Sequence, residues 1–169
     1  MKKRFIYPLL FLVILVFNSS GDDFYNPSEY FPVLMERTEL EKSVKFRDAQ
    51  EIENPGKIYY KDQVIYLNEK YKGIHIIDNS NPELPKNIGF INLPGCIDIA
   101  IKNNSMFADN ATDLVAIDIS NISSLKVTDR VKNVFPESTP PDLEYIPYMF
   151  SVSNRPSNTI IVGWKKLDK

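Results

Sequence analysis

The sequence predicts a mostly β protein, with short antiparallel sheets arranged as propeller-like blades (two blades plus a hairpin) and one short N-terminal helix. Short β-branched runs recur from Gly56 onward, separated by Asn, Asp, Pro and Gly, which is the pattern of short strands joined by turns. Two stretches also match at an offset of 40 residues. A period near 40 with several strands per unit is typical of propeller blades.

The composition excludes several classes of protein. The chain has 169 residues, 43% of them hydrophobic and 25% charged, so one globular domain is expected. Twenty basic residues against twenty-two acidic ones give a net charge of -2, and we expect no nucleic-acid partner. With Cys96 as the one cysteine and His75 as the one histidine, neither a cysteine-rich zinc site nor a multi-histidine metal site is possible. No cofactor is predicted.

Residues 1–21 are predicted to be a signal peptide. Lys2-Lys3-Arg4 precede an uncharged apolar run over residues 5–17, and Asn18-Ser19-Ser20-Gly21 follows it. A basic, then apolar, then small-residue order is typical of a secretory leader, and this run is too short to span a bilayer as a helix. We therefore expect an exported protein of the periplasm or cell surface, with outer-membrane association possible. Removal of the leader leaves 17 basic and 22 acidic residues, a net charge of -5.

The end of the leader leaves the question of anchoring open. A bacterial lipoprotein leader is followed by a cysteine that receives the lipid, whereas this chain continues Ser20-Gly21-Asp22. Gly21 stands where that cysteine is expected. Membrane contact is thus predicted only through the leader itself or through a lost lipid anchor.

Residues 22–55 are predicted to form a linker and a short helix. Asn26, Pro27 and Pro32 interrupt the first part, which favours an irregular segment. Thr38 and Glu41 have capping-box spacing, which predicts a helix from about Glu39 to Lys45. We expect it to cover one edge of the sheet domain; the alternative is a helix that docks a partner.

Residues 56–169 are predicted to form the β-repeat domain, with repeats at about 56–92 and 97–132 and a partial third repeat at 145–164. Residues 73–91 align with residues 113–131. Strands are expected in the second repeat at 97–102, 105–109, 114–118 and 126–132. The partial repeat is predicted to be a hairpin of 148–152 with 159–164.

The second repeat contains Leu114-Val115-Ala116-Ile117-Asp118-Ile119-Ser120-Asn121, which closely resembles the core of the LVIVD repeat. Ile74 to Pro82 resembles the same core, with His75 departing from it, and Ile122 replaces the proline of the second copy. The resemblance implies an exported bacterial protein, often a lipoprotein, that builds a β-propeller. It implies architecture and location more than an activity.

The repeat positions are predicted to form turns. Asp, Ser and Asn recur at the same places in the two copies, and their side chains commonly bond to nearby backbone in turns. The alternative is that the aspartates are ligands or catalytic acids. These structural repeat positions are Asp78, Ser80, Asn81, Asp118, Ser120 and Asn121. The preceding run, residues 114–117, is expected to be buried on both faces between neighbouring blades.

Other candidate residues have structural interpretations. His75 is expected to be structural and Cys96 a small buried thiol. The polar stretch 109–113 is interpreted as a hairpin connection, with a cation loop as the alternative. A run of tyrosines is interpreted as strand formers, with a sugar-stacking surface as the alternative: Tyr59, Tyr60, Tyr66 and Tyr71.

The leading functional hypothesis is an exported, non-enzymatic β-repeat protein of the bacterial cell envelope that presents a binding surface to a protein or glycan partner. One alternative is an enzyme subunit whose acidic site, including Asp98, Asp109 and Asp113, is completed by oligomerisation. Another is a truncated propeller with no independent activity. Since a ring needs about four to eight blades, at least one blade face should lack a neighbouring blade. We expect the N-terminal helix to cover one end and the C-terminal hairpin the other.

Overall fold

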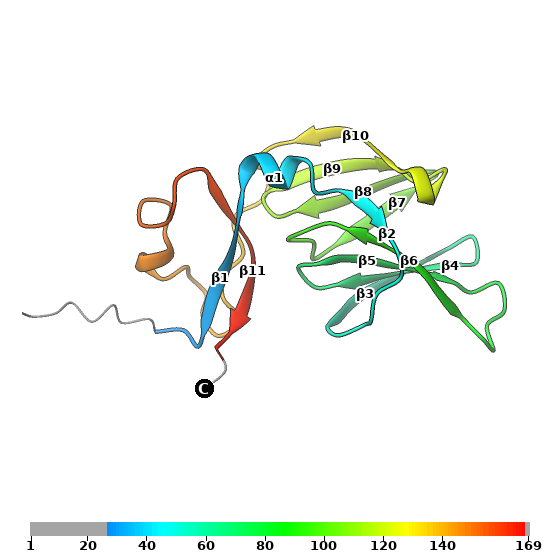
Figure 1. Ribbon diagram of the computed structural model, residues 1–169, viewed down its shortest axis with the longest axis horizontal. Coiled ribbons are helices and arrows are strands. Elements are labelled where there is room, and N and C mark those ends of the chain that lie inside the picture. The colour runs from blue at the N-terminus through cyan, green and yellow to red at the C-terminus, as the bar shows by residue number, and fades with distance from the viewer. Residues whose placement is uncertain (1–26, 168–169) are drawn as a thin grey trace, which may run out of the picture.

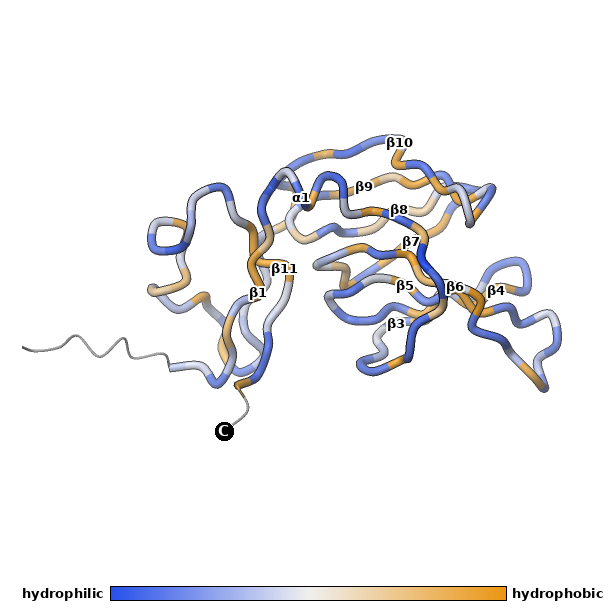
Figure 2. The backbone as a smooth tube through the Cα atoms, in the orientation of Figure 1, coloured by the Kyte–Doolittle hydropathy of each residue, from blue (hydrophilic) through white to orange (hydrophobic). Residues whose placement is uncertain are grey.

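A computed structural model describes residues 27–167, which form three antiparallel sheets and one α-helix. The predicted mostly β, propeller-like class is confirmed. Two of the sheets stack as blades, and the third lies beside them (Figure 1). Apolar residues follow the strands, and polar residues dominate the loops that connect them (Figure 2). The predicted signal peptide, residues 1–21, lies outside the described residues.

Each blade is an antiparallel sheet whose strands follow chain order. In blade 1, β3 (Pro55–Lys61), β4 (Val64–Glu69), β5 (Gly73–Asp78) and β6 (Lys86–Asn92) are joined at the β6 edge by β2 (Lys45–Arg47). Blade 2 consists of β7 (Ile99–Lys102), β8 (Ser105–Asn110), β9 (Asp113–Asp118) and β10 (Lys126–Val131). A 3-10 turn, η1 (Ile122–Ser124), precedes β10. Both repeats thus have the four strands expected of a blade.

The β3–β4 hairpin of blade 1 and the β7–β8 hairpin of blade 2 occupy equivalent positions, and each has a turn residue that tolerates a positive φ angle. Lys61 pairs with Val64 across the β3–β4 turn, and Lys102 pairs with Ser105 across the β7–β8 turn. Asp62 and Asn103 have positive φ angles of 51° and 53°. Asp and Asn tolerate this left-handed conformation better than most residues. The two blades are therefore offset by 41 residues at these strands.

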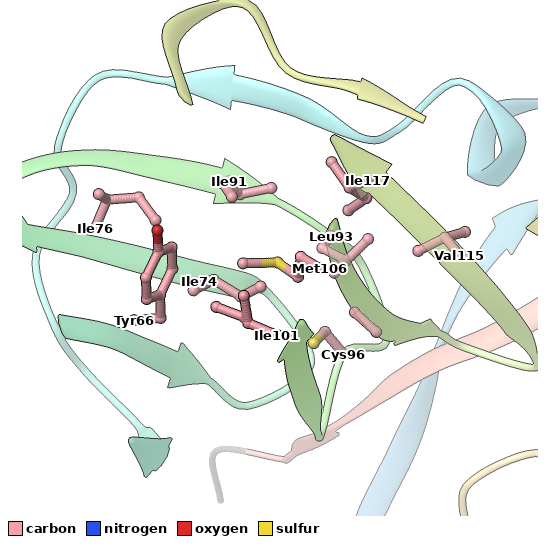
Figure 3. Packing of buried hydrophobic residues seen from close by; sticks show 11 residues of the cluster. Tyr66, Ile74, Ile76, Ile91, Leu93, Cys96, Ile101, Met106, Val115 and Ile117 are labelled. Carbon is pink, nitrogen blue, oxygen red and sulfur yellow. The ribbon is translucent and has the colours of Figure 1, made fainter. Parts of the chain in front are cut away.

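The main hydrophobic core lies between the two blades (Figure 3). Blade 1 contributes residues such as Tyr66, Ile74 and Ile76, and blade 2 contributes Met106 and Ile117, all no more than 7% exposed. Since side chains alternate along a strand, each blade presents one face to this core and the other face away from it. The expectation that residues 114–117 are buried on both faces is wrong, because the alternate positions of β9 are only half-buried.

The predicted linker includes a strand, which corrects the interpretation of residues 22–55. Tyr30–Glu36 form β1, and this strand pairs with β11 (Thr159–Lys166) in the third sheet. Pro32 does not prevent the pairing because a proline is tolerated on an edge strand. The two ends of the described chain are therefore held together by backbone hydrogen bonds.

The predicted C-terminal hairpin does not form. Tyr148–Phe150 form a 3-10 turn, η2, and β11 pairs with β1 instead. Tyr148 is 81% exposed, whereas Phe150 packs edge-to-face on Trp164 with ring centroids 6.0 Å apart. The residues that the sequence pattern assigned to a strand thus cover β11 with side chains and make no ladder with it.

The helix is shorter and earlier than predicted. It spans Arg37–Glu41 (α1), and its N-cap residue, Glu36, makes no capping hydrogen bond with its side chain. The capping box between Thr38 and Glu41 therefore does not form. The Glu41 carboxylate instead pairs with Arg37 and Lys132. Leu40 is fully buried in a small apolar cluster with Ile160 and Val162.

The two ends of the blade pair are covered differently from the expectation. The helix α1 and the strand β11 do not lie at opposite ends of the blade pair: α1 bonds to Asp113 of blade 2, and β11 lies beside the strand ends of the blades, with Gly163 next to Tyr71 of blade 1 (Figure 1). Segment 48–54 covers the outer face of blade 1: the Gln50 carbonyl accepts a hydrogen bond from Asn87, and the backbone N–H groups of Glu53 and Asn54 donate to Glu69.

Candidate binding groove on the second blade

The predicted repeat residues form the same turn in both blades. The backbone N–H of Ser80 donates to Asp78 at 2.8 Å, and that of Ser120 donates to Asp118 at 2.9 Å. The asparagines that follow, Asn81 and Asn121, each accept a backbone N–H at 3.2 Å. The bonds from the serine residues hold the pKa of both aspartates below the usual value. These carboxylates act locally, on the turn that contains them.

His75 is buried in blade 1 beside a carboxylate. Its Nε2 lies 3.1 Å from Glu69 Oε2, and both side chains are at most 2% exposed. The Glu69 carboxylate also accepts the backbone N–H of Glu53 at 3.2 Å, and the ring of His75 packs edge-to-face on Phe90. This pair was not predictable from local sequence patterns, because Glu69 and His75 belong to different strands. The hydrogen bond from the Glu53 backbone to Glu69 attaches segment 48–54 to blade 1.

Cys96 is fully buried between the blades. Burial, together with the negative charge of Asp109, raises the pKa of the thiol well above its usual value. A nucleophilic cysteine needs the opposite shift. The Asn68 amide donates to the sulfur at 3.4 Å and to the Cys96 carbonyl at 3.3 Å, so this residue forms part of the contact between the blades.

The three acids of the enzyme hypothesis do not form one cluster. Asp113 is fully buried and receives hydrogen bonds from Arg37 at 2.8 and 2.9 Å, from Arg130 at 2.7 Å and from the Asn133 backbone at 3.1 Å. Burial opposes its ionisation, but these donors prevail and hold its pKa below the usual value. Asp113 is therefore committed to a structural ion triad, whereas Asp98 and Asp109 line a groove.

This groove lies on the face of blade 2 that points away from blade 1, and we call it the blade-2 groove. Its floor includes Ala100, Phe107 and Leu114, and its opposite wall includes Phe135 and Ile161. Ala100 and Phe107 are direct cross-strand neighbours. The volume is about 610 Å³, within the range of small-ligand and side-chain binding sites. The lining is mainly apolar.

The repeat explains why this face is apolar. With the offsets of the two blades, Phe107, Asp109 and Leu114 of blade 2 correspond to the blade 1 positions of Tyr66, Asn68 and Ile74. Those three blade 1 residues are buried against blade 2. The floor of the groove is therefore the face on which a following blade would pack, and here the 135–139 segment and Ile161 of β11 line the side opposite it.

Asp109 is the polar group at the centre of this face. Its carboxylate accepts the backbone N–H of Ile97 at 2.9 Å and that of Asp98 at 2.8 Å. Among residues 27–167, no lysine or arginine forms an ion pair with it. Burial raises the pKa of Asp109, and hydrogen bonds from backbone N–H groups and the Cys96 thiol offset only part of this effect. The groove thus contains a carboxylate without a cationic partner.

The other two acids of the groove do have cationic partners. Asp98 pairs with Lys57 of blade 1 across the exposed edge of the blades. Glu137 forms a two-point pair with Arg155, with one bond at 2.8 Å, and also accepts the Ile161 backbone N–H at 3.3 Å. Because these charges are neutralised, Asp109 dominates the electrostatic character of the site.

Sequence reasoning named the two aspartates of the groove but missed its apolar walls. Phe107 and Phe135 are each 39% exposed. The repeat alignment could have identified Phe107, since it aligns with a buried tyrosine. The tyrosines do not form a common surface: Tyr66 is in the core, Tyr59 donates to the Ile101 carbonyl at 2.8 Å, and Tyr60 is 59% exposed.

The polar stretch 109–113 connects β8 to β9, with Asn110 paired to Asp113 across the turn. Within the described part of the chain, no group of three or more metal-binding side chains is present, and no helix is long and apolar enough to cross a membrane.

Comparison with known proteins found no matching family model, no matching curated protein and no matching solved structure.

Proposed function

We propose that this chain is an exported, non-enzymatic β-repeat protein of the bacterial cell envelope, which binds a partner through the blade-2 groove. The observation that carries the proposal is the exposed inter-blade face: Phe107, Asp109 and Leu114 occupy positions that are buried against a neighbour in blade 1. An apolar concave surface with a few polar groups is the usual form of a binding site.

The location part of the proposal is supported by sequence. Residues 2–21 have the charge and polarity order of an export signal, and the LVIVD-like repeats resemble those of exported bacterial proteins. Fractionation of cells that produce the full chain tests this part. We expect a shortened protein outside the cytoplasm, and a cytosolic product that retains Met1 would contradict it.

The lining of the groove favours a protein partner over a glycan. Glycan sites need several polar side chains that can bond to sugar hydroxyls. Here the floor around Asp109 is aliphatic or phenyl, and the uncharged polar side chains of the lining are Ser138 and Thr139. Apolar side chains of a partner protein match such a surface. The enzyme alternative has less support, because Asp113 is held by Arg37 and Arg130.

Photo-cross-linking in intact cells tests the groove as the binding site. A photo-reactive residue is placed at Phe135 in the groove wall or, as a control, at Tyr60, which is 59% exposed on β3 of blade 1. We expect a discrete cross-linked product in the envelope fraction from position 135 and none from position 60. Equal products from the two positions, or none from position 135, would reject the groove.

A further inference from the structure

The unpaired carboxylate of the groove identifies the chemistry of its occupant. We propose that the blade-2 groove binds a partner-protein segment in which a lysine or arginine is flanked by apolar side chains, with the cation placed on Asp109. The inference rests on the proposed function and deepens it, since it names the class of partner for the same site.

Charge distinguishes Asp109 from the other two acids of the groove. Asp98 and Glu137 have cationic partners within the chain, Lys57 and Arg155. Among the described residues, Asp109 has uncharged donors, which are backbone N–H groups and the Cys96 thiol, and no cationic one. A carboxylate that is partly removed from water is stabilised by a nearby cation. The direction of the pKa shift at Asp109 agrees with this, because burial raises it and no internal cation opposes the change.

The residue at the equivalent position of blade 1 also indicates what Asp109 binds. At the position equivalent to Asp109, blade 1 has Asn68, whose amide donates to the Cys96 carbonyl of the segment that packs against it. An asparagine can donate, whereas an ionised carboxylate can only accept. Whatever packs on blade 2 must therefore supply the donor, and a cationic side chain supplies the strongest one.

The side chains around Asp109 are apolar, which fits a cation flanked by apolar residues. Phe107 in the floor of the groove and Phe135 in the opposite wall are each 39% exposed. Aromatic faces attract lysine and arginine head groups and pack on their methylene stems. Leu114 and Ile161 complete the lining and match the apolar neighbours of the cation. An acidic or purely polar segment would leave these side chains without contacts.

A series of three tripeptide probes tests the proposal on the full chain. The probes are acetyl-Leu-X-Leu-amide with X as lysine, norleucine or glutamate, so that the first two differ in the ammonium group alone. Binding is followed by NMR on the backbone N–H signals of Ile97 and Asp98, which donate to Asp109. We expect the lysine probe to bind about tenfold more tightly than the norleucine probe and the glutamate probe to bind most weakly.

Two variants test whether Asp109 causes the preference for the lysine probe. Asp109→Asn should reduce the ratio of the lysine and norleucine affinities to about one, because the neutral amide has no charge to attract the ammonium group. Asp98→Asn is the matched control: this carboxylate also lines the groove but is paired with Lys57, so the ratio should persist. If Asp109→Asn does not fold, high salt replaces it, because salt should narrow the gap between the two probes in the unaltered protein.

The outcomes separate this inference from the proposed function. Equal binding of the lysine and norleucine probes would overturn the cationic occupant and leave the groove as a binding site. Absence of binding by all three probes, with the cross-link from position 135 intact, would also overturn the inference alone. Self-association that Phe107→Ala abolishes would overturn it in favour of a second copy as the occupant. Loss of the position 135 cross-link would reject the proposed function itself.

Discussion

Arg37 of α1 donates to both carboxylate oxygens of the fully buried Asp113 in β9, at 2.8 and 2.9 Å. This two-point bond joins the N-terminal helix to blade 2. Since α1 directly follows β1, and β1 pairs with β11, the same bond fixes the third sheet against the blade. The bond between Arg37 and Asp113 therefore helps to position Ile161 of β11, which forms part of the wall of the blade-2 groove.

Arg37→Met should destabilise the protein by about 2–3 kcal/mol, because it leaves a buried carboxylate with fewer donors. Arg130 still pairs with Asp113 at 2.7 Å, which keeps the loss from being larger. Lys132→Met is the control: its side chain is 55% exposed and pairs with Glu41, so about 0.5 kcal/mol or less is expected. Chemical denaturation measures the free energy of unfolding of both variants. Equal losses would contradict the assigned role of Arg37.

The ion triad of Asp113 with Arg37 and Arg130 predicts that the stability of the protein depends on pH in acid. The pKa of Asp113 is lower in the folded chain than usual, so its contribution to stability is complete above the unfolded pKa of about 3.9 and is lost as pH falls through the lower folded value. The difference in free energy of unfolding between the parent and Asp113→Asn should therefore be largest near neutral pH and shrink below about pH 4. A difference that stays constant down to about pH 2 would contradict the triad.

The repeated turns predict matched effects in the two blades. Asp78→Ala and Asp118→Ala each remove the acceptor of a serine backbone N–H, and each should lower the midpoint temperature of unfolding by a similar, small amount. The Asp→Asn variants retain an acceptor oxygen and should lose less. Thermal unfolding followed by circular dichroism is suitable. If alanine and asparagine have equal effects at both positions, the carboxylates do not act through the turn.

The C-terminal strand should contribute strongly to stability through Trp164. This side chain is 8% exposed, packs on Phe150, and donates its Nε1–H to the Ser138 carbonyl at 3.0 Å. Trp164→Ala should cost about 3–5 kcal/mol, whereas Tyr148→Ala, at a residue 81% exposed, should have little effect. Similar losses from the two variants in denaturant unfolding would contradict the packing of η2 on β11.

The blades were predictable because their signals are local. Turn residues such as Asp78 and Asn103, and the alternation in the strands, depend on near neighbours in the chain. The pairing of β1 with β11 was not predictable, because it joins residues more than a hundred positions apart and Pro32 argued against a strand. Within the groove, Asp98 and Asp109 were named, but the role of Phe107 depends on which face a following blade would cover.

Filling the blade-2 groove tests whether this groove binds the partner. Ala100 is exposed on the groove floor beside Phe107, so Ala100→Trp should block the groove without disturbing the core. Val127→Trp, on β10 outside the groove, is the matched control. We predict that Ala100→Trp abolishes the in-cell cross-link from position 135 and that Val127→Trp leaves it intact. A cross-link that survives Ala100→Trp in a folded, exported protein would contradict the account.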